Sequence, residues 1–342
     1  MVSSASPSSE IVGLGSYVPQ KVMTNQELES IMDTTDEWIR TRTGISERRV
    51  ADVTEGTSDL AVAACRDALQ DAGLRAKDLD LMIVATCTPD YFMPGLGVLI
   101  QNKLGCRPIP AIDLRGQCSG FAWALSTADA YSKMADYQYI LVVGSDLQTR
   151  ILDYSLDGRN SAVLFGDGAG ACVLKVKKTL GESQPSGLLD HILGSDGSGF
   201  SHLMVPRPGC QANNSSFISH NDIDSKKTAP YMDGRQVFKY ASYYMEKTVT
   251  ELMARNKLSI DDIDLIIPHQ ANLRLSKILK TKLGIPPEKM VSVIEKFGNT
   301  TSASLPLCFV EARQSGKLKK GSLIITTTFG SGFTWGGNLI RW

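Results

Sequence analysis

A cysteine flanked by glycines is the first residue of this sequence that could do chemistry. Cys118 lies in Gly116-Gln117-Cys118-Ser119-Gly120, between an apolar segment and a segment with a helical pattern. The unpaired N–H groups and the dipole of a helix N-terminus favour a thiolate and can hold an oxyanion. Free cysteines are more often small core residues, as expected for Cys65 and Cys172. The position between two glycines at a helix start nevertheless favours a nucleophile.

A histidine and an asparagine are the candidate helpers of this nucleophile. His269 follows the apolar run 263–267, and ligands of parallel α/β sheets bind at the carboxyl ends of strands. The other three histidines, at 191, 202 and 220, lie in polar contexts. Asn299, in FGNTTS, precedes another predicted helix, where an asparagine is ordinarily a cap. Its place in a sequence repeat, described next, favours a role in the site.

The elements that must position these residues occur twice. Segment 68–86 resembles 251–270, and the repeat alignment that relates them superposes Leu81 on Leu265. Each copy predicts a helix, a turn and a buried strand, followed by further elements in the same order. Alternating strands and helices with short loops imply parallel sheets covered by helices. The paired later elements are strands at 109–114 and 290–295, helices from Cys118 and Thr301, strands at 139–146 and 322–330, and glycine-rich stretches at 161–174 and 330–342.

This repeat predicts two similar halves, about 1–175 and 187–342, related by a pseudo-twofold axis. A prior of roughly one domain per 150 residues agrees with two units in 342 residues. The motif FGNTTS (297–302), which contains Asn299, then occupies in the second half the corner that holds Cys118 in the first. The two residues are therefore expected to approach each other where the halves meet.

Composition excludes several classes of protein. Thirty-six basic and 36 acidic residues give zero net charge, which argues against a protein that wraps nucleic acid. Seven scattered cysteines without a CxxC motif argue against a disulfide framework and a structural zinc site. The N-terminus has no signal-peptide pattern, and no apolar run reaches membrane-spanning length. We therefore expect a cytoplasmic protein with reduced thiols, no metal and no membrane segment.

Two further segments have no assigned chemistry. The motif GDGAG (166–170) lacks the GK[ST] of a phosphate-binding loop and precedes a strand, so it indicates close backbone packing. Residues 206–229 are polar and rich in Pro, Asn and Ser, which is typical of a long loop that covers a site or moves.

Taken with Cys118, His269 and Asn299, motifs along the whole chain resemble those of β-ketoacyl-acyl-carrier-protein synthase III. These are GLGSYVP, DEWIRTRTGI, QCSGF, LVVGSD, FGDGAGA, PHQANLR, FGNTTSAS and FGSGFTWG. The resemblance implies a thiolase-like αβαβα five-layer fold built from two βαβαβαββ halves, in a homodimer. It also implies acyl transfer from acyl-CoA to Cys118. Decarboxylative condensation with malonyl-acyl-carrier protein would follow, as the initiation of type II fatty-acid synthesis, with no permanently bound cofactor.

The resemblance assigns roles to individual residues. His269 and Asn299 would donate to the malonyl thioester carbonyl, and the N–H groups of Cys118 and Ser331 would form the oxyanion hole. Acyl-CoA binding falls to Trp38, Arg42, Arg159, Gly234 and Asn272. An acidic carrier protein would meet Lys239, Arg274 and Lys282. Met93, with Phe92 beside it, would shape the acyl pocket from the partner subunit.

The chain departs from the family pattern at several of these positions. Met93 replaces the common aromatic residue before the proline and is flexible, so we expect starters longer than acetyl to be accepted. Ser331 replaces the middle glycine of the C-terminal motif, where only its N–H is needed. Gly116-Gln117 replaces the usual pair of small residues before the nucleophile. The loop 206–229 is longer than usual and is expected to alter the entrance.

Alternative functions remain at this stage. Gly116-x-Cys118-x-Gly120 also fits the nucleophile elbow of a hydrolase, although that fold needs a single sheet. A degradative thiolase would need a second cysteine near the C-terminus, where FGSGFTWGGNLIRW has none. A non-catalytic partner subunit would be expected to lose its nucleophile or helpers. The main rival is a specialised homologue that makes C–C, C–O or C–N bonds in secondary metabolism.

Overall fold

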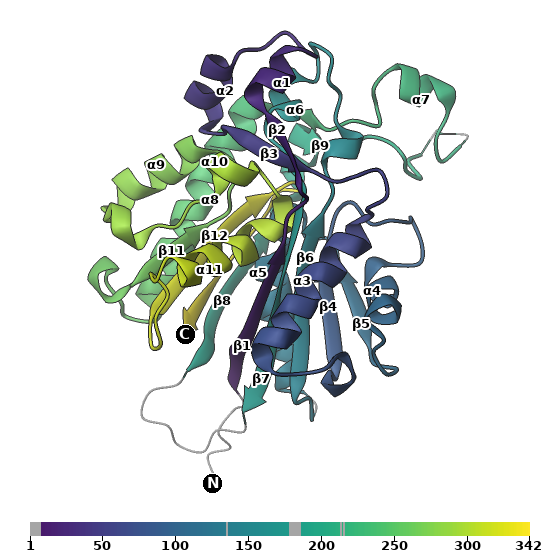
Figure 1. Cartoon of the computed structure of the whole chain (residues 1–342). Helices are drawn as coiled ribbons and strands as arrows, with labels where there is room; N and C mark the ends of the chain where they lie inside the picture. The colour runs from purple at the N-terminus through teal and green to yellow at the C-terminus, as the bar shows by residue number, and fades with distance from the viewer. Residues whose placement is uncertain (1–7, 135, 178–185, 213, 215) are drawn as a thin grey trace.

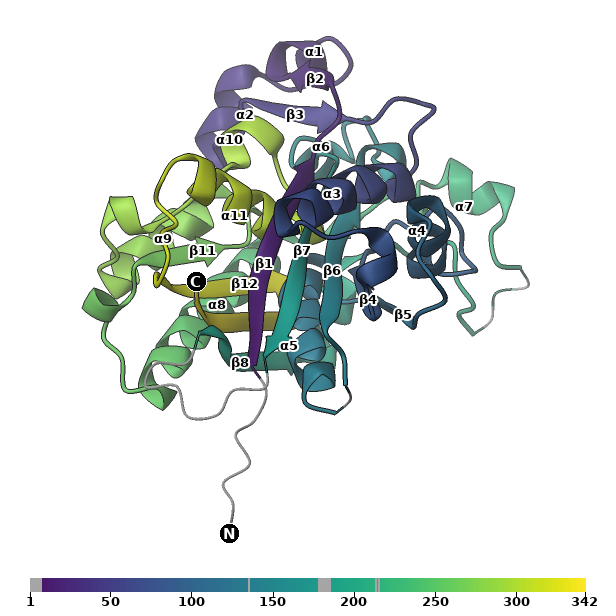
Figure 2. The same cartoon turned by 60° about the horizontal axis from the view of Figure 1, so that its bottom comes forward.

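Two mixed sheets with the same strand order form the frame of the computed structural model (Figures 1 and 2). The structure describes residues 8–134, 136–177, 186–212, 214 and 216–342. The first sheet has the order β1 (Ser8–Tyr17), β7 (Gly168–Lys177), β6 (Tyr139–Asp146), β4 (Leu81–Ala85), β5 (Ala111–Leu114). The second has the order β8 (Gly187–Ser195), β13 (Thr334–Arg341), β12 (Leu323–Gly330), β11 (Leu265–Pro268).

Helices separate and cover these sheets in five layers. The central pair, α5 (Gly120–Ser132) and α11 (Ser304–Gln314), packs between them in one apolar core that includes residues of both sheets. The outer face of the first sheet is covered by α3 (Thr57–Ala72) and α4 (Leu96–Leu104). The second is covered by α8 (Gly234–Arg255) and α9 (Leu273–Leu283). This αβαβα arrangement confirms the predicted fold class.

The predicted strands at 139–146 and 322–330 form, and all their residues from Ile140 to Asp146 and from Leu323 to Gly330 are buried. These strands are continuous apolar or β-branched runs, which is typical of strands covered on both faces.

The predicted strand at 290–295 is wrong. Only Met290 forms an isolated bridge to Ile266, and α10 (Ile294–Phe297) begins within the predicted range. The side chain of Gln270 takes the place of a strand partner: its Oε1 accepts from the Val293 N–H at 3.1 Å and from the Ser292 hydroxyl at 3.2 Å. Satisfied in this way, the backbone turns into a helix instead of continuing a ladder.

Shorter elements connect these layers. The long loop 206–229 is mostly irregular, as predicted, and residues 213 and 215 lie outside the described part of the chain. The remaining elements are β2 (Lys21–Thr24), α1 (Asn25–Glu29), α2 (Asp36–Thr43), β3 (Glu47–Val50), α6 (Arg159–Ala162), β9 (Leu203–Met204), α7 (His220–Asp224) and β10 (Tyr231–Met232).

Polar side chains fasten the central helix α5 to strand β13 of the second sheet. The Trp123 indole N–H donates to the Trp335 carbonyl at 2.9 Å. The Asn338 amide donates to the Ala122 carbonyl and to the Ser126 hydroxyl, at 3.1 and 3.0 Å. Because α5 begins next to Cys118, these bonds fix the helix that follows Cys118 against the half of the molecule that carries His269 and Asn299.

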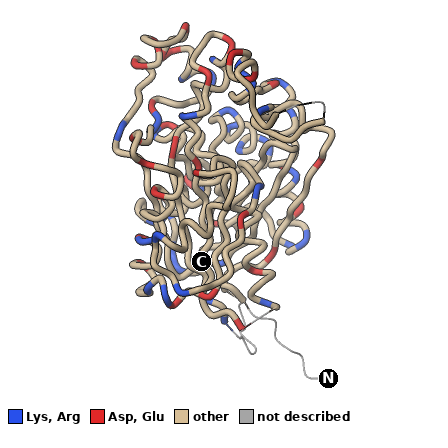
Figure 3. Tube along the Cα trace, turned by 90° about the vertical axis from the view of Figure 1, so that its right-hand side faces the viewer, with Lys and Arg blue, Asp and Glu red and all other residues tan. Residues whose placement is uncertain are grey.

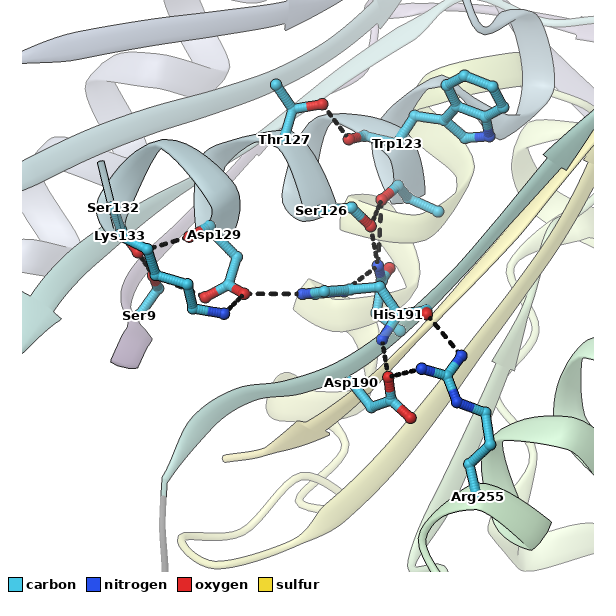
Figure 4. A network of polar contacts seen from close by, with 12 residues as sticks. Ser9, Trp123, Ser126, Thr127, Asp129, Ser132, Lys133, Asp190, His191 and Arg255 are labelled. Atoms are coloured by element: carbon cyan, nitrogen blue, oxygen red, sulfur yellow. Dashed lines mark hydrogen bonds and ion pairs between the residues drawn. The ribbon is translucent and has the colours of Figure 1, made fainter. Parts of the chain in front are cut away.

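A pair formed by a buried acid and a partly buried imidazole extends this connection to β8 (Figure 4). The Asp129 carboxylate lies 3.1 Å from His191 Nε2 and accepts from the Ser9 hydroxyl at 3.1 Å. His191 Nδ1 lies 3.0 Å from the Asn338 amide nitrogen, which cannot accept a hydrogen bond and shares its two hydrogens among Nδ1, the Ala122 carbonyl and the Ser126 hydroxyl. Nδ1 is thus the acceptor, and Nε2 carries the proton that is donated to Asp129.

We expect Asp129→Ala to lower the free energy of unfolding by about 2 kcal/mol, because it removes the acceptor of the partly buried His191 Nε2 and leaves the buried Ser9 hydroxyl with Ser132 alone as acceptor. Thermal and urea unfolding measure the loss. Lys133→Met is the control: Lys133 also binds Asp129, but its side chain is 45% exposed, so its loss should cost at most about 1 kcal/mol. Equal losses in the two variants would contradict this account.

Candidate functional site

Two cavities meet at the thiol of Cys118. The first, of about 740 Å³, is lined by the loops that follow β4, β5 and β6 and by residues 203–208. The second, of about 520 Å³, is lined by α8, by the start of α9 and by His269 and Asn299. Cys118 belongs to both linings. A group attached to its sulfur could occupy one cavity while a second reactant enters through the other.

The backbone around Cys118 forms a sharp corner between β5 and α5. Gln117 has a φ of 45°, the 3₁₀ turn Gln117–Ser119 follows, and α5 begins at Gly120. A side chain on Gly120 would meet Ala85 Cβ at 2.9 Å, so only glycine lets the corner approach β4 this closely. This geometry is the predicted strand-to-helix turn, and it leaves the N–H of Cys118 in the first turn without an intrahelical partner.

The same corner recurs at Ser302, within the segment that was predicted to hold it. Thr301 has a φ of 47°, and a 3₁₀ turn, Thr301–Ala303, leads into α11. The repeat alignment, extended from Leu81 and Leu265, pairs Cys118 with Ser302, the last residue of the motif FGNTTS that was predicted to occupy this corner. Asn299 lies three residues before its corner, because the motif FGNTTS places the turn after the asparagine.

The end of each central strand faces the corner of the other half. At the end of β6, the Asp146 carboxylate accepts from the Ser302 N–H at 3.0 Å and from its hydroxyl. At the equivalent end of β12, Gly330 faces Cys118, and a Cβ there would lie 3.0 Å from the Cys118 nitrogen. The N–H that is capped at Ser302 is therefore left open at Cys118, as an oxyanion hole requires.

Ser331 follows Gly330 and lines the first cavity beside Cys118. Its φ is not positive, so a side chain is accommodated here without strain. The hydroxyl donates to the Leu203 carbonyl, away from the nucleophile.

Hydrogen bonds of its backbone and of its side chain orient the amide group of Asn299. Its N–H donates to the Leu164 carbonyl at 2.8 Å, and its carbonyl accepts from Gly166 N–H at 3.1 Å. Its side-chain Oδ1 accepts from the Thr301 N–H at 2.9 Å, so the Nδ2 group is the end left to donate in the second cavity. Gly166 also explains GDGAG: a Cβ there would lie 2.3 Å from the Phe297 carbonyl oxygen, which confirms the packing interpretation.

His269 lies just past β11, where its N–H donates to the Thr327 carbonyl at 2.8 Å. Burial lowers the pKa of its imidazole to about 3, so the ring is neutral at physiological pH. Neither ring nitrogen has a hydrogen-bond partner within the described chain. A buried, neutral and unpartnered imidazole in a cavity can donate one N–H to a developing negative charge.

The protonation state of Cys118 differs from the prediction. Burial, and to a smaller extent nearby Asp146, raises the pKa of its thiol to about 12 in spite of the smaller lowering effect of its own N–H. The expectation of a resting thiolate stabilised by the helix start is therefore wrong. The resting group is a thiol, because burial of a charge outweighs one turn of oriented N–H groups.

Four of the five predicted acyl-CoA residues, namely Trp38, Arg42, Gly234 and Asn272, line the second cavity. The guanidinium carbons of Arg42 and Arg159 each lie 4.7 Å from the Trp38 ring centre. Arg159 therefore rests directly on the indole and also donates to the Asp33 carbonyl at 2.9 Å. A planar ligand could enter between Arg159 and Trp38 only if the arginine moved.

The predicted carrier-protein residues lie around α8 and α9. Arg274 lines the second cavity and stacks on Phe238, at 5.2 Å from the ring centre. Lys239 lies over Tyr240, and Lys282 pairs with Glu246. Neither lysine lines the cavity.

The two residues that were predicted to shape the acyl pocket lie in different surroundings. Phe92 lines the first cavity, and its ring meets that of Phe217 edge-on, with centres 4.6 Å apart. Met93 does not line the cavity of its own chain and is 76% exposed. Arg207, Pro208 and Thr228 of the long loop also line this cavity.

Asp146 and Ser302 were missed by the sequence analysis. The signal was available, because the repeat alignment pairs Ser302 with Cys118 and Asp146 with Gly330. Its meaning depended on knowing that each strand end faces the opposite corner, which only the structure shows.

Comparison with known proteins identifies the family. The models for the 3-oxoacyl-[acyl-carrier-protein] synthase III domain and its C-terminal region match residues 112–197 and 253–342. A β-ketoacyl-[acyl-carrier-protein] synthase III of Bacillus anthracis is 43% identical over 97% of this chain and 98% of its own. The chain belongs to the β-ketoacyl-[acyl-carrier-protein] synthase III family.

Solved structures agree with this membership. The 3-oxoacyl-[acyl-carrier-protein] synthase III of Aquifex aeolicus has a TM-score of 0.86 at 38% identity, covering 98% of this chain and all of its own. The priming β-ketosynthase of the R1128 polyketide pathway has a TM-score of 0.87 at 32% identity, covering 100% and 98%. This chain is therefore similar in structure both to a synthase III and to a priming ketosynthase of a polyketide pathway.

We expect alkylation of Cys118 by iodoacetamide to accelerate about tenfold per pH unit from pH 7 to 10. The thiolate is the reactive form, and with a pKa of about 12 its fraction keeps rising throughout this range. Intact-mass and peptide mapping follow the modification, with free cysteine as the reference, which should level off above its pKa of about 8.5. A plateau for Cys118 near pH 8.5 would contradict the effect of burial.

Proposed function

We propose that this chain is the condensing acyltransferase β-ketoacyl-acyl-carrier-protein synthase III. It transfers an acyl group from acyl-CoA to Cys118 and condenses it with malonyl-acyl-carrier protein. The observation that carries this proposal is Cys118 in the common wall of two cavities, with His269 and Asn299 lining the second. One cavity can hold the acyl chain while the other admits the thioester arm of each substrate.

In the first step, Cys118 Sγ attacks the acyl-CoA thioester carbonyl. The oxyanion accepts from the N–H groups of Cys118 and Ser331, in the space that Gly330 leaves open. The C–S bond to CoA then breaks, and the proton lost by the thiol is recovered by the departing CoA thiolate. Because the resting sulfur is protonated, attack and proton loss must be concerted or follow closely.

In the second step, the malonyl thioester loses CO2. The electron pair of the broken C–C bond forms an enolate whose oxygen accepts from His269 and from Asn299 Nδ2. A neutral imidazole is suited to this role, since it keeps its N–H and adds no competing positive charge. The enolate carbon attacks acyl-Cys118, the C–S bond breaks to give the β-ketoacyl product, and the released Cys118 thiolate takes up a proton from water to restore the resting thiol.

The remaining assignments belong to the same proposal. Residues 1–175 carry the nucleophile and residues 187–342 carry its helpers. Trp38, Arg42, Arg159, Gly234 and Asn272 hold acyl-CoA, and Met93 and Phe92 shape the acyl pocket in a homodimer. The enzyme works in the cytoplasm without a bound cofactor. Within the described residues, no group of three or more metal-binding side chains and no helix of membrane-spanning length and apolarity occurs.

The docking surface for the carrier protein lies near Lys239, Arg274 and Lys282. Charges of both signs are interspersed over the molecule (Figure 3), so attraction of an acidic partner must be local. The exposed lysines contribute mainly to the association rate, which salt would reduce.

A priming synthase of secondary metabolism is the second candidate. The R1128 priming ketosynthase is 32% identical to this chain, and the comparison covers 100% of this chain and 98% of that one. This similarity supports a role in a polyketide pathway as the alternative. The two functions share the chemistry at Cys118 and differ in the carrier protein and starter. Rates with carrier proteins of fatty-acid and polyketide synthesis, compared at equal concentration, distinguish them.

We expect Cys118→Ala to abolish acyl-enzyme formation, because the nucleophile is lost. His269→Ala and Asn299→Ala should still take up an acyl group but lose malonyl decarboxylation by about 10²–10³-fold, as for one oxyanion donor. Intact mass after incubation with acyl-CoA and release of ¹⁴CO2 measure the two steps. Acylation of the Cys118→Ala protein, or normal decarboxylation by either other variant, would overturn these roles.

A further inference from the structure

The first cavity carries more charge than a pocket for a plain alkyl chain requires. Arg150, Arg207 and Asp90 all line it, but each is occupied by the protein. Arg150 donates to the carbonyls of residues 52 and 55 at 2.6 and 2.7 Å. Arg207 pairs with Asp222 at 3.2 Å, and Asp90 accepts from the N–H and hydroxyl of Ser58, both at 2.8 Å. These three side chains are therefore already engaged in hydrogen bonds or ion pairs that stabilise the fold.

Arg115 is different, because it has no polar partner within the described chain. It follows β5, lines the first cavity and lies three residues before Cys118. The nearest acid in sequence, Asp113, is engaged elsewhere: its two oxygens accept from the N–H groups of Leu96 and Gly97 at 2.5 and 2.7 Å. Arg115 is an exposed residue, so its guanidinium is an unpaired positive charge on the solvent-accessible side of the cavity that reaches Cys118.

The repeat gives this position a counterpart. The repeat alignment pairs Arg115 with Asn299, so both stand three residues before a strand-to-helix corner. Asn299 lines one cavity that reaches Cys118, and Arg115 lines the other. The position that holds the candidate enolate donor in the second half thus presents a cation in the first.

We propose that Arg115 binds a carboxylate at the far end of the acyl group carried by Cys118. The preferred starter is then a half-thioester of a short dicarboxylic acid. This inference rests on the proposed function. Arginine offers a planar fork that pairs with both oxygens of a carboxylate. Three residues span at most about 10 Å, within the combined reach of a short acyl chain and an arginine side chain.

Pairs of acyl-CoA substrates with equal carbon number test this specificity. Succinyl-CoA is compared with butyryl-CoA, and glutaryl-CoA with valeryl-CoA, by kcat/KM for transfer to Cys118. We expect the wild type to prefer the charged member, and Arg115→Gln to lower the charged-to-neutral ratio by about 10- to 100-fold. Acetyl transfer, which does not reach Arg115, should change less than about twofold. Arg115→Lys should keep part of the preference, since it retains charge without the fork.

Arg107→Gln is the matched control. Arg107 also borders β5, but it pairs with Asp80 and lines neither cavity. Its loss should leave the charged-to-neutral ratio unchanged. If Arg115→Gln also leaves the ratio unchanged while acetyl transfer proceeds, the inference is overturned and the proposed function stands. If it slows all starters equally and weakens self-association, Arg115 pairs with a second copy, which also overturns the inference. Absence of transfer from every acyl-CoA would overturn the proposed function instead.

Discussion

The buried carboxylate of Asp146 is the interaction on which the geometry between the halves depends. Its oxygens accept six hydrogen bonds from the described chain, from Thr86, Cys87, Thr88 and Ser302. A fully buried charge without a cation is costly unless its lone pairs are occupied in this way. The end of β6 is thereby tied both to the loop after β4 and to the Ser302 corner, so Asn299, three residues earlier, is held in register with the first half.

The corresponding contact at the Cys118 corner lacks a carboxylate, so the two related corners differ in the chemistry that they allow. Gly330 takes the place of Asp146 and leaves the Cys118 N–H uncapped. On the Cys118 side, hydrogen bonds from the Trp123 indole and the Asn338 amide hold α5 against β13. Two related corners thus serve different purposes: a carboxylate closes one as a structural joint, and the absence of a side chain keeps the other available to substrate.

Local patterns were sufficient to predict the buried strands and the strand-to-helix corner at Cys118, whereas the five layers were expected from the family resemblance. Buried strands such as 139–146 are continuous apolar runs, and glycines mark the corner of Cys118, so both are properties of short segments. The strand at 290–295 could not be excluded in this way, because it is replaced by a bond from the distant side chain of Gln270. The protonation state of Cys118 was likewise unpredictable, since burial in the assembled core decides it. Arg159 resting on Trp38 depends on a rotamer that sequence does not specify.

That closed stack of Arg159 on Trp38 acts as an internal competitor for any planar ligand of the second cavity. A ligand that stacks on the indole must first displace the guanidinium, so its apparent affinity falls in proportion to the fraction of molecules in which the arginine has moved. The same arginine can then close over the ligand from its other side. Such an arrangement lowers the affinity for the bound ligand and favours its rapid exchange. Rapid exchange is an advantage to a catalyst that must release one thioester carrier before it can accept the next.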